Sequence, residues 1–437
     1  MSSREPIDVE LRDPLWGPIP VNGGELAVID TPAFQRLRGI KQLGFAEFVF
    51  PGAVHHRYLH SIGAMHAAGL LATRVLGGAR QLAAGERARL LQLVRLAALL
   101  HDIGHPPLSH SAEALLPDRA LLFLDGEPMG TGGEQRASHE DMTLKLVTDS
   151  ALGETIDAAF ADAGIAAAHV AAIIAEGPGR HADAFRVGGL DWWPLLHAMV
   201  SGEMDVDRMD YLRRDSYFAG VEYGSYDASW LISNALVEED GGVARLAIDV
   251  RALASFEHFL LARYHMFQMV YFHPKSDIYD EMLKNWLRSV GDEARFPADP
   301  AAYVRCNDAW LWQRLRESKD PWARRIDERR PYTLLTELRS EEDRARYPEL
   351  VAALESAGVH ALRITAKPVL SRYAASPAKR DNPLLVVDKK PPFGPRRVQR
   401  IEEVTDLFGR YARTLQMERV YVAPEDRRAA RELLARL

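Results

Sequence analysis

An apolar segment that ends on an adjacent histidine and aspartate most constrains what this chain can fold into. Residues 97–110 read AALLHDIGHPPLSH, so His101 and Asp102 follow a run of small and branched apolar residues. Two more histidines, His105 and His110, come shortly afterwards. Burying ionisable side chains is costly unless each one is paired or bound to a metal ion. The pattern therefore predicts a helix whose buried end presents a cation-binding group.

Composition limits how such a cation can be held. The chain has 437 residues with 15 histidines and one cysteine, Cys306. A single cysteine excludes an internal disulfide and a cysteine-rich zinc site, so the ligands must be histidines and carboxylates. The net charge of -7 gives no indication of nucleic-acid binding. Without an apolar signal segment or a membrane-length apolar run, we expect a cytoplasmic protein with no membrane partner.

The periodicity of apolar residues predicts a mainly α fold. Residues 1–29 carry proline and glycine signals typical of a hairpin or extended arm, and residues 45–51 are typical of a short strand or extended link. A helix start is predicted at Thr31-Pro32, with Gly44 as its end. Further helices are predicted over residues 87–100, 139–147, 152–175, 192–200 and 253–282.

The C-terminal part of the sequence has a different texture. From about residue 359, strand-like and helical pieces alternate, which predicts a small α+β lobe. Strands are expected over 361–369, 384–387 and 418–422, and helices over 398–415 and 424–436. We divide the chain into residues 1–290, with an N-terminal arm, and residues 291–437.

Two further residues are candidates to complete a metal site. His60 begins a helix rich in glycine and alanine, and Asp207 shares one helical face with Tyr211 and Asp215 at four-residue spacing. Imidazole and carboxylate ligands suit a divalent ion that acts on phosphate groups.

Six ordered blocks of sequence resemble one family. They cover residues 30–44, 49–53, 56–63, 101–110, 138–140 and 205–211. Together they resemble the deoxynucleoside triphosphate triphosphohydrolases of the HD-domain phosphohydrolase superfamily, which include bacterial dNTPases and an animal enzyme with a sterile-alpha-motif domain. The similarity extends from about residue 10 to 290. It continues faintly into the C-terminal lobe. The resemblance implies an HD-domain helical core, to which the pattern of the last part of the chain adds a smaller α+β C-terminal lobe.

The resemblance implies roles for the polar residues of the central blocks. The metal ligands would be His60, His101, Asp102 and Asp207. The ion could be Mn, Fe, Zn, Ni or Mg, with Mg also on the substrate phosphates. Catalytic roles would fall to His105, His110, His139 and Glu113. Glu113 would orient a catalytic histidine; the alternative is that it is exposed on the next helix.

A second set of residues would recognise the nucleotide. Arg57, Arg208 and Arg263 would hold phosphates, and Arg208 replaces a lysine of the animal enzyme. Gln42 and Asp215 would bind the sugar 3'-OH, while Leu43 and Tyr211 would exclude a ribose 2'-OH. Tyr271 would lie near the base or sugar. Core packing is the alternative for Tyr211 and Tyr271.

Three N-terminal residues suggest activation by a nucleotide. Asp30, Gln35 and Arg38 match positions that bind an activating guanine nucleotide, GTP or dGTP, between subunits of the animal enzyme. The alternatives are a helix cap for Asp30 and a surface charge for Arg38. Trp16 stands at a position that is usually histidine in the family. The resemblance also implies a homo-oligomer, as a dimer, tetramer or hexamer.

The expected activity is metal-dependent hydrolysis of dNTPs, including dGTP, to deoxynucleoside and inorganic triphosphate. Two alternatives remain open. One is an HD phosphohydrolase of other specificity, such as a nucleotidase or a single-strand nuclease. The other is a nucleotide-sensing binding module without catalysis. The preferred base and the native metal are left open by the sequence.

Overall fold

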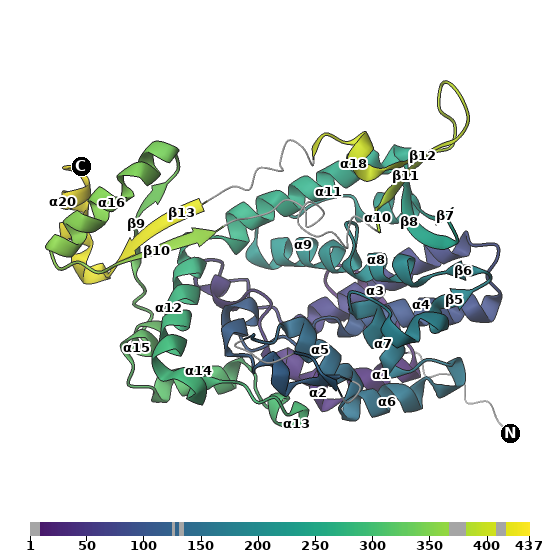
Figure 1. Ribbon diagram of the computed structural model, residues 1–437, viewed down its shortest axis with the longest axis horizontal. Coiled ribbons are helices and arrows are strands. Elements are labelled where there is room, and N and C mark those ends of the chain that lie inside the picture. The colour runs from purple at the N-terminus through teal and green to yellow at the C-terminus, as the bar shows by residue number, and fades with distance from the viewer. Residues whose placement is uncertain (1–8, 125–126, 131–134, 367–381, 408–416) are drawn as a thin grey trace.

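Helices form the main body of the molecule, and a small lobe of strands and helices lies at one end (Figure 1). The computed structural model describes residues 9–124, 127–130, 135–366, 382–407 and 417–437. The predicted mainly α fold with a smaller sheet-containing C-terminal region is confirmed. None of the helices described has the length and apolar character needed to cross a lipid bilayer.

Two long helices form the centre of the body. α3 (Arg57–Gly77) packs along α4 (Ala84–Leu100) and also against α9 (Val206–Ala219). Gly63 explains the approach of α9, because a Cβ at this position would lie 2.0 Å from the Asp210 Oδ1 atom. The small residues of α3 therefore make room for buried polar groups as well as for a neighbouring helix.

The N-terminal hairpin is confirmed as β1 (Val9–Asp13) paired with β2 (Gly17–Val21). An unpredicted helix follows, α1 (Gly23–Ile29), which begins with a capping box at Asn22. The predicted helix start at Thr31-Pro32 is confirmed in α2 (Pro32–Gln35), but the helix continues only as a 3-10 turn to Gly39.

The aromatic segment after residue 43 is not a strand. Gly44–Phe48 forms a 3-10 helix, and the rings of Phe45 and Phe48 pack on those of Tyr279 and Trp312. The aromatic residues that suggested β-structure instead serve burial.

The predicted long helix over 253–282 is divided. α11 (Leu253–Met266) passes into a π-helical turn, Phe267–Tyr271, and α12 (Pro274–Val290) begins at a proline. Proline cannot donate the hydrogen bond that a continuous helix requires at that position. The other helices of the body are α5 (His139–Thr148), α6 (Ala151–Ala159), α7 (Ala167–Ile174), α8 (Trp193–Ser201), α10 (Ala228–Ser233), α13 (Pro300–Tyr303), α14 (Asp308–Glu317) and α15 (Pro321–Asp327).

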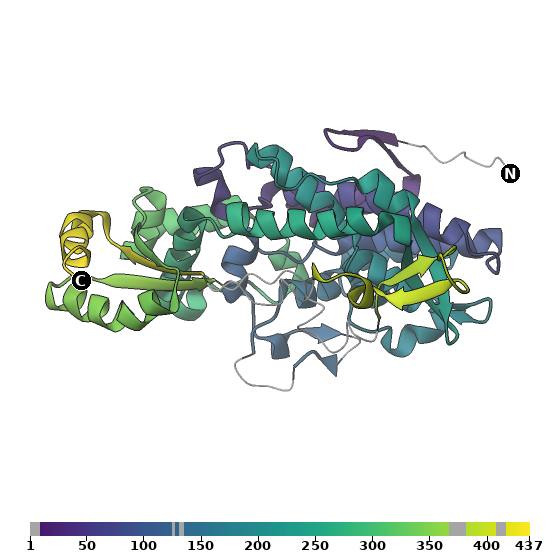
Figure 2. The ribbon, with the colours of Figure 1, turned by 90° about the horizontal axis from the view of Figure 1, so that it is seen from above.

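A mixed sheet lies on the side of the body opposite to the small lobe (Figures 1 and 2). Its strands run in the order β12-β11-β8-β6-β5, with β7 paired to β8. The bounds are β5 (Arg186–Val187), β6 (Leu190–Asp191), β7 (Ala235–Asp240), β8 (Val243–Asp249), β11 (Leu385–Asp388) and β12 (Arg397–Arg400). Because β11 pairs in parallel with β8, the C-terminal part of the chain returns to the body.

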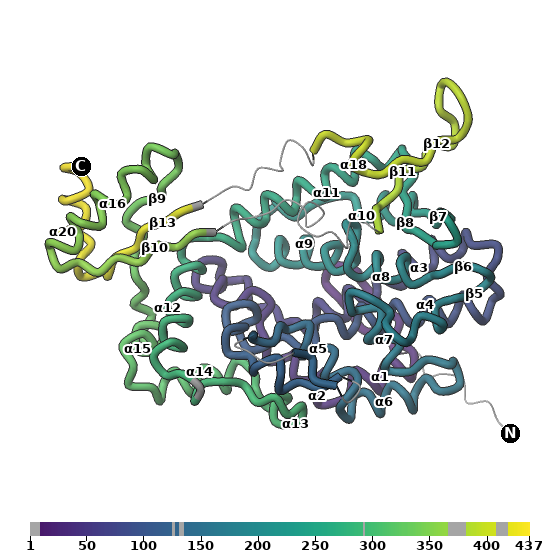
Figure 3. Tube along the Cα trace, in the orientation of Figure 1, coloured from purple at the N-terminus to yellow at the C-terminus, as the bar shows by residue number. Residues whose placement is uncertain are grey.

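The small lobe has its own hydrophobic core. The antiparallel strands β10 (Ala361–Ala366), β13 (Met417–Val422) and β9 (Thr333–Leu338) pack against α16 (Glu341–Ser356) and α20 (Arg427–Leu434). The trace in Figure 3 shows this lobe beyond α12, far from β11 and β12.

The helix predicted over 398–415 is wrong at its start, where β12 precedes the short α18 (Ile401–Val404). Residues 367–369 of the first predicted strand and residues 408–415 of that helix lie outside the described residues. The division of the chain at residue 290 stays a prediction.

Candidate active site

Four predicted metal ligands converge from three segments of the body. His60 lies in α3, His101 and Asp102 follow α4, and Asp207 lies in the first turn of α9. The Nε2 atom of His60 is 3.1 Å from Asp207 Oδ1 and 3.5 Å from Asp102 Oδ2. His101 Nε2 lies 3.4 Å from the same Asp207 oxygen and 3.4 Å from His60 Nε2.

The hydrogen bonds on the far side of both imidazoles suit metal binding. His60 Nδ1 donates to Asp210 Oδ2 at 2.9 Å, and His101 Nδ1 donates to the Ala98 carbonyl at 2.8 Å. In each neutral ring this arrangement leaves the Nε2 lone pair facing the carboxylates. Two imidazoles and two carboxylates therefore form a donor set that fits a divalent transition metal.

Asp210 belongs to a buried network that the sequence did not reveal. Its carboxylate binds Arg214 through two contacts of 2.7 and 2.9 Å, and Arg214 also contacts Asp13 at 2.9 Å. Trp16, in the turn of the N-terminal hairpin, donates Nε1–H to Asp210 Oδ1 at 2.7 Å. The four-residue spacing of Asp210 and Arg214 was the one available signal. The hairpin thus supports the partner of a candidate ligand.

The pKa values of the candidate ligands His60 and Asp102 are strongly shifted. Burial disfavours a charged imidazole, but the hydrogen bonds with Asp207 and Asp210 outweigh burial and raise the pKa of His60 to about 10. Burial likewise opposes the ionisation of Asp102, yet Arg57 and His101 hold the pKa of this carboxyl well below its usual range. A cation that binds here must therefore displace protons from the imidazoles.

The loop after the His-Asp pair is held in an unusual conformation. Leu108 and Ser109 have φ values of 55° and 56°, in the left-handed region that costs non-glycine residues of order 1–3 kcal/mol each. Three contacts fix them: Ser109 Oγ donates to the Lys41 carbonyl at 2.7 Å, Arg57 Nε donates to Ser109 Oγ at 2.8 Å, and Leu108 N donates to Asp308 Oδ1 at 2.8 Å. Asp308 was missed by the sequence analysis.

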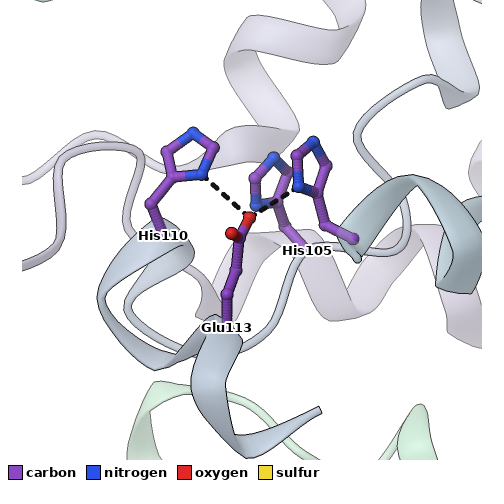
Figure 4. A group of neighbouring side chains, drawn as sticks. His105, His110 and Glu113 are labelled. Carbon is purple, nitrogen blue, oxygen red and sulfur yellow. Dashed lines mark hydrogen bonds and ion pairs between the residues drawn. The ribbon is translucent and has the colours of Figure 1, made fainter. Parts of the chain in front are cut away.

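The predicted catalytic residues form a second cluster beside the first. Glu113 Oε1 accepts hydrogen bonds from His110 Nδ1 at 2.9 Å and from His139 Nδ1 at 2.6 Å (Figure 4). The rings of His105 and His139 are stacked, with their centroids 3.9 Å apart. Burial opposes the ionisation of Glu113, but its bonds to His110 and His139 lower the pKa of this carboxyl. Glu113 is therefore directed at the histidines rather than free on the surface.

Close packing of α5 places His139 in this cluster. A Cβ at Gly104 would lie 2.2 Å from the His139 carbonyl oxygen, so only glycine permits the contact. Thr143 fastens α5 there, because its Oγ1 accepts from Gly104 N at 2.9 Å and donates to the His101 carbonyl at 3.0 Å.

The predicted phosphate-binding arginines are all buried, and each already has protein partners. Arg57 Nη1 pairs with Asp102 Oδ2, so it also orients a candidate metal ligand. Arg208 Nη1 donates to the carbonyls of Gly202 at 2.7 Å and Glu203 at 3.1 Å. The Arg263 guanidinium lies 5.0 Å from the centre of the Phe267 ring.

The predicted sugar-binding residues are brought together by a residue that we did not predict, His55. Asp215 accepts from His55 Nε2 at 2.8 Å and from the Tyr271 hydroxyl at 2.8 Å. Gln42 N donates to the His55 carbonyl at 3.0 Å, and Gln42 Oε1 is buried without a hydrogen-bond partner. The rings of Tyr211 and Tyr271 are 6.1 Å apart. Leu43 is partly buried against the main core.

The candidate activator residues lie around Tyr58. Arg38 stacks over the Tyr58 ring at 3.5 Å and donates to Gln35 Oε1 at 2.8 Å. Burial raises the pKa of Tyr58, Arg38 opposes this shift, and the nearby charge of Asp30 adds to it. Asp30 and Arg38 are exposed. The cap of the following helix is Thr31, not Asp30.

Comparison with protein families accounts for the arrangement of the first cluster. Residues 57–215 match the HD domain family, and residues 226–357 match a family described as the HD associated region. The chain therefore contains an HD domain followed by an HD associated region. The match to the HD domain begins at Arg57 and ends at Asp215, so it contains all four candidate metal ligands.

This HD-domain protein is similar to proteins from distant organisms. It is 30% identical over 322 residues to an uncharacterized protein of Methanocaldococcus jannaschii, covering 74% of this chain and 58% of that protein. It is 30% identical over 320 residues to the deoxynucleoside triphosphate triphosphohydrolase SAMHD1 homolog of Dictyostelium discoideum, covering 71% of this chain and 55% of that protein. The chain thus spans little more than half the length of these relatives.

The fold of the HD-domain protein extends over a whole solved structure. A hypothetical protein from Aquifex aeolicus superposes with a TM-score of 0.73 and 28% sequence identity, covering 98% of this chain and 100% of that chain. The similarity therefore includes the small lobe as well as the helical body.

Proposed function

We propose that this HD-domain protein hydrolyses dNTPs to a deoxynucleoside and inorganic triphosphate. One observation carries the proposal: the Asp102 Oδ1 atom lies 3.3 Å from His105 Nε2. This contact joins the candidate metal centre to the cluster of histidines that could act as acids. A phosphate held at the first cluster would present its ester oxygen to the second.

The side chains of the two clusters suit different catalytic roles. A divalent cation held by His60, His101, Asp102 and Asp207 would polarise a phosphoryl oxygen and lower the pKa of water at the site. His110 is the most accessible member of the second cluster, with 67% of its side chain exposed. A histidine hydrogen-bonded to a carboxylate is suited to donating a proton to the leaving 5' oxygen. Glu113 would orient His110 and stabilise its protonated form.

Deoxynucleotide recognition is supported by the groups around Asp215. This carboxylate is held by His55 and Tyr271 and could still accept a hydrogen bond from a sugar 3'-OH. The unpartnered Gln42 Oε1 atom is a second buried acceptor that a substrate hydroxyl would satisfy. Leu43 and Tyr211 would crowd a ribose 2'-OH.

Phosphate binding would draw on the buried arginines. Arg57 lies beside Asp102. Burial raises the pKa of the Tyr211 hydroxyl, and the nearby charges of Arg263 and Arg208 oppose this rise. Arginine forms paired hydrogen bonds with phosphate oxygens, and Mg on the phosphates would reduce their repulsion.

The proposed function includes regulation by a nucleotide. Asp30, Gln35 and Arg38 would bind a guanine nucleotide between subunits of a homo-oligomer. The exposed positions of Asp30 and Arg38 beside the Tyr58 ring support this role, since a planar base could contact them from outside.

Product analysis tests the proposed reaction. The purified protein is incubated with each dNTP and NTP, alone and in pairs, with Mn2+ or Mg2+. We expect equal amounts of deoxynucleoside and inorganic triphosphate from dNTPs, and a higher rate in mixtures that contain GTP or dGTP. Release of a monophosphate instead would indicate a nucleotidase and contradict the proposal.

Two aspartate variants distinguish loss of the candidate metal centre from non-specific effects of an aspartate-to-alanine substitution. Asp207→Ala removes a candidate ligand and should abolish triphosphate release. Asp162→Ala, at an exposed position of a 3-10 turn outside both clusters, is the matched control and should keep full activity. Full activity in Asp207→Ala would remove this residue from the ligand set.

A further inference from the structure

The second cluster is itself a set of metal-ligating groups. His105, His110, His139 and Glu113 each place one ligand atom within 4.8 Å of the others. In Figure 4 the His105 and His110 rings both lie against the Glu113 carboxylate. Three imidazoles and one carboxylate match the number and type of ligands that zinc prefers in four-coordinate sites. The cluster shares no ligand with the His60, His101 and Asp102 group.

His105 provides an independent sign that a ligand is missing. Its side chain is 2% exposed, and its Nδ1 atom is buried without a hydrogen-bond partner. On the other side of the ring, Nε2 faces the Asp102 carboxylate, which can only accept. The hydrogen of the neutral ring therefore lies on Nε2, and a bare Nδ1 lone pair is left in the interior. An electron-pair acceptor such as a metal ion would satisfy it.

We propose that this cluster is a second, weaker site for a zinc-like transition metal, and that its occupation inhibits the enzyme. The inhibitory role rests on the proposed function, in which His110 supplies a proton. A metal on His110 Nδ1 and Glu113 would take away the carboxylate that orients this acid. The binding site itself does not depend on which reaction the protein catalyses.

The two sites would bind their metal ions independently of each other. In two-metal hydrolases the ions are about 3.5–4 Å apart and share ligands. Here His105 lies at the boundary between the two groups, because its Nε2 atom faces Asp102 Oδ1 at 3.3 Å and its Nδ1 atom is buried on the other side of the ring. The ions would not share a ligand, so loss of one site should leave the other intact.

Metal stoichiometry tests the site directly. The metal-free protein is titrated with Zn2+, and bound metal is measured by equilibrium dialysis with elemental analysis. We expect two ions per chain, one bound more weakly. We expect Glu113→Gln to lower the affinity for the second ion by at least roughly 10- to 100-fold. This is the loss of metal affinity typical when a residue that supports a metal ligand is removed.

The design includes a matched control and a second variant. Glu140→Gln makes the same substitution at an exposed residue next to His139 and should keep two ions. His110→Gln alters the most exposed ligand, so its folding is not at risk, and it should behave like Glu113→Gln. One ion per chain in the wild type, or two tightly bound ions in both variants, would overturn the proposal.

An activity measurement separates this proposal from the proposed function. Triphosphate release by the Mn-loaded wild type should fall as Zn2+ fills the second site, in step with the measured occupancy. Full activity at full occupancy would overturn the inhibitory role. A protein that binds two ions but cleaves no dNTP would contradict the proposed function and leave the second site established.

Discussion

His60 Nδ1 donates to Asp210 Oδ2 at 2.9 Å, on the side of the ring opposite to the other candidate ligands. Asp210 is in turn held by Arg214 and by the Nε1–H of Trp16. Partners of metal ligands fix the orientation and basicity of the imidazole. We therefore expect Trp16, in the N-terminal hairpin, to influence how strongly the candidate metal centre binds a cation.

The first prediction concerns this hairpin. Trp16→Phe keeps an aromatic ring but removes the donor to Asp210. We expect a several-fold loss of cation affinity, less than the roughly 10- to 100-fold typical of a direct partner, because Arg214 still holds the carboxylate. The free energy of unfolding should fall by about 1.5–3 kcal/mol, as for other hydrogen bonds to charged groups.

Chelator competition measures this affinity, and urea unfolding measures the stability. Trp230→Phe is the matched control, since Trp230 is exposed and its Nε1 makes only a long contact of 3.4 Å with the Arg251 carbonyl. Equal cation affinity in Trp16→Phe and wild type would show that the hairpin does not act on the metal centre.

The candidate metal ligands were predictable because local sequence determines their neighbourhood. His101 and Asp102 stand at the end of one helix, and the four-residue spacing of Asp207, Tyr211 and Asp215 places them on one face of another. The resemblance to known dNTPases connected these segments. Helix periodicity alone does not show which helices meet.

The partners of these residues were not predictable, because they come from distant parts of the chain. Asp308 binds Lys41 N across 267 residues of sequence, and Asp210 binds His60 across 150. An aspartate at the first position of a helix, such as Asp308, has the local signature of a favourable charge at the helix N-terminus, and an aspartate within a helix that of a surface charge. Only the tertiary fold distinguishes these roles.

A second prediction tests the proposed acid. His110→Gln removes the group that would protonate the leaving oxygen, and general acid catalysis contributes about 10²- to 10⁴-fold. We expect kcat for triphosphate release to fall within this range while KM changes little. Steady-state kinetics with the preferred dNTP measures both.

The control for this variant is His258→Gln, an exposed histidine of α11. It should retain the wild-type kcat. If His110→Gln also retains the wild-type kcat, another group donates the proton, and His139 becomes the next candidate because it shares the Glu113 carboxylate.

A third prediction concerns stability and pH. Asp308 accepts from Lys41 N at 3.0 Å and Leu108 N at 2.8 Å, and burial raises its pKa from 3.8 to about 6 in spite of these bonds. Between these two pH values the folded state binds more protons than the unfolded chain, so the free energy of unfolding falls as the pH rises. At about 1.36 kcal/mol per pKa unit, the fall is on the order of 2–3 kcal/mol.

Urea unfolding from pH 4 to 7.5 measures this contribution as the difference between wild type and Asp308→Asn. The asparagine does not titrate, so the difference should change across the window and level off above about pH 6. Asp162→Asn, at an exposed position, should give a difference that is flat with pH. A flat difference for Asp308→Asn would mean that Asp308 has an ordinary pKa.

The last prediction links the Tyr271 hydroxyl to recognition of the sugar. Tyr271→Phe removes the donor to Asp215 Oδ2 at 2.8 Å while keeping the ring, so the carboxylate is less firmly oriented toward a 3'-OH. We expect KM for a dNTP to rise by about fivefold to tenfold, the equivalent of a hydrogen bond of ~1 kcal/mol. A 2',3'-dideoxynucleotide lacks the 3'-OH, so its KM should be the same in the variant and the wild type. Tyr217→Phe, at an exposed position, is the control and should change neither value. An equal rise in KM for both substrates would show that Tyr271 supports the pocket without acting through the 3'-OH.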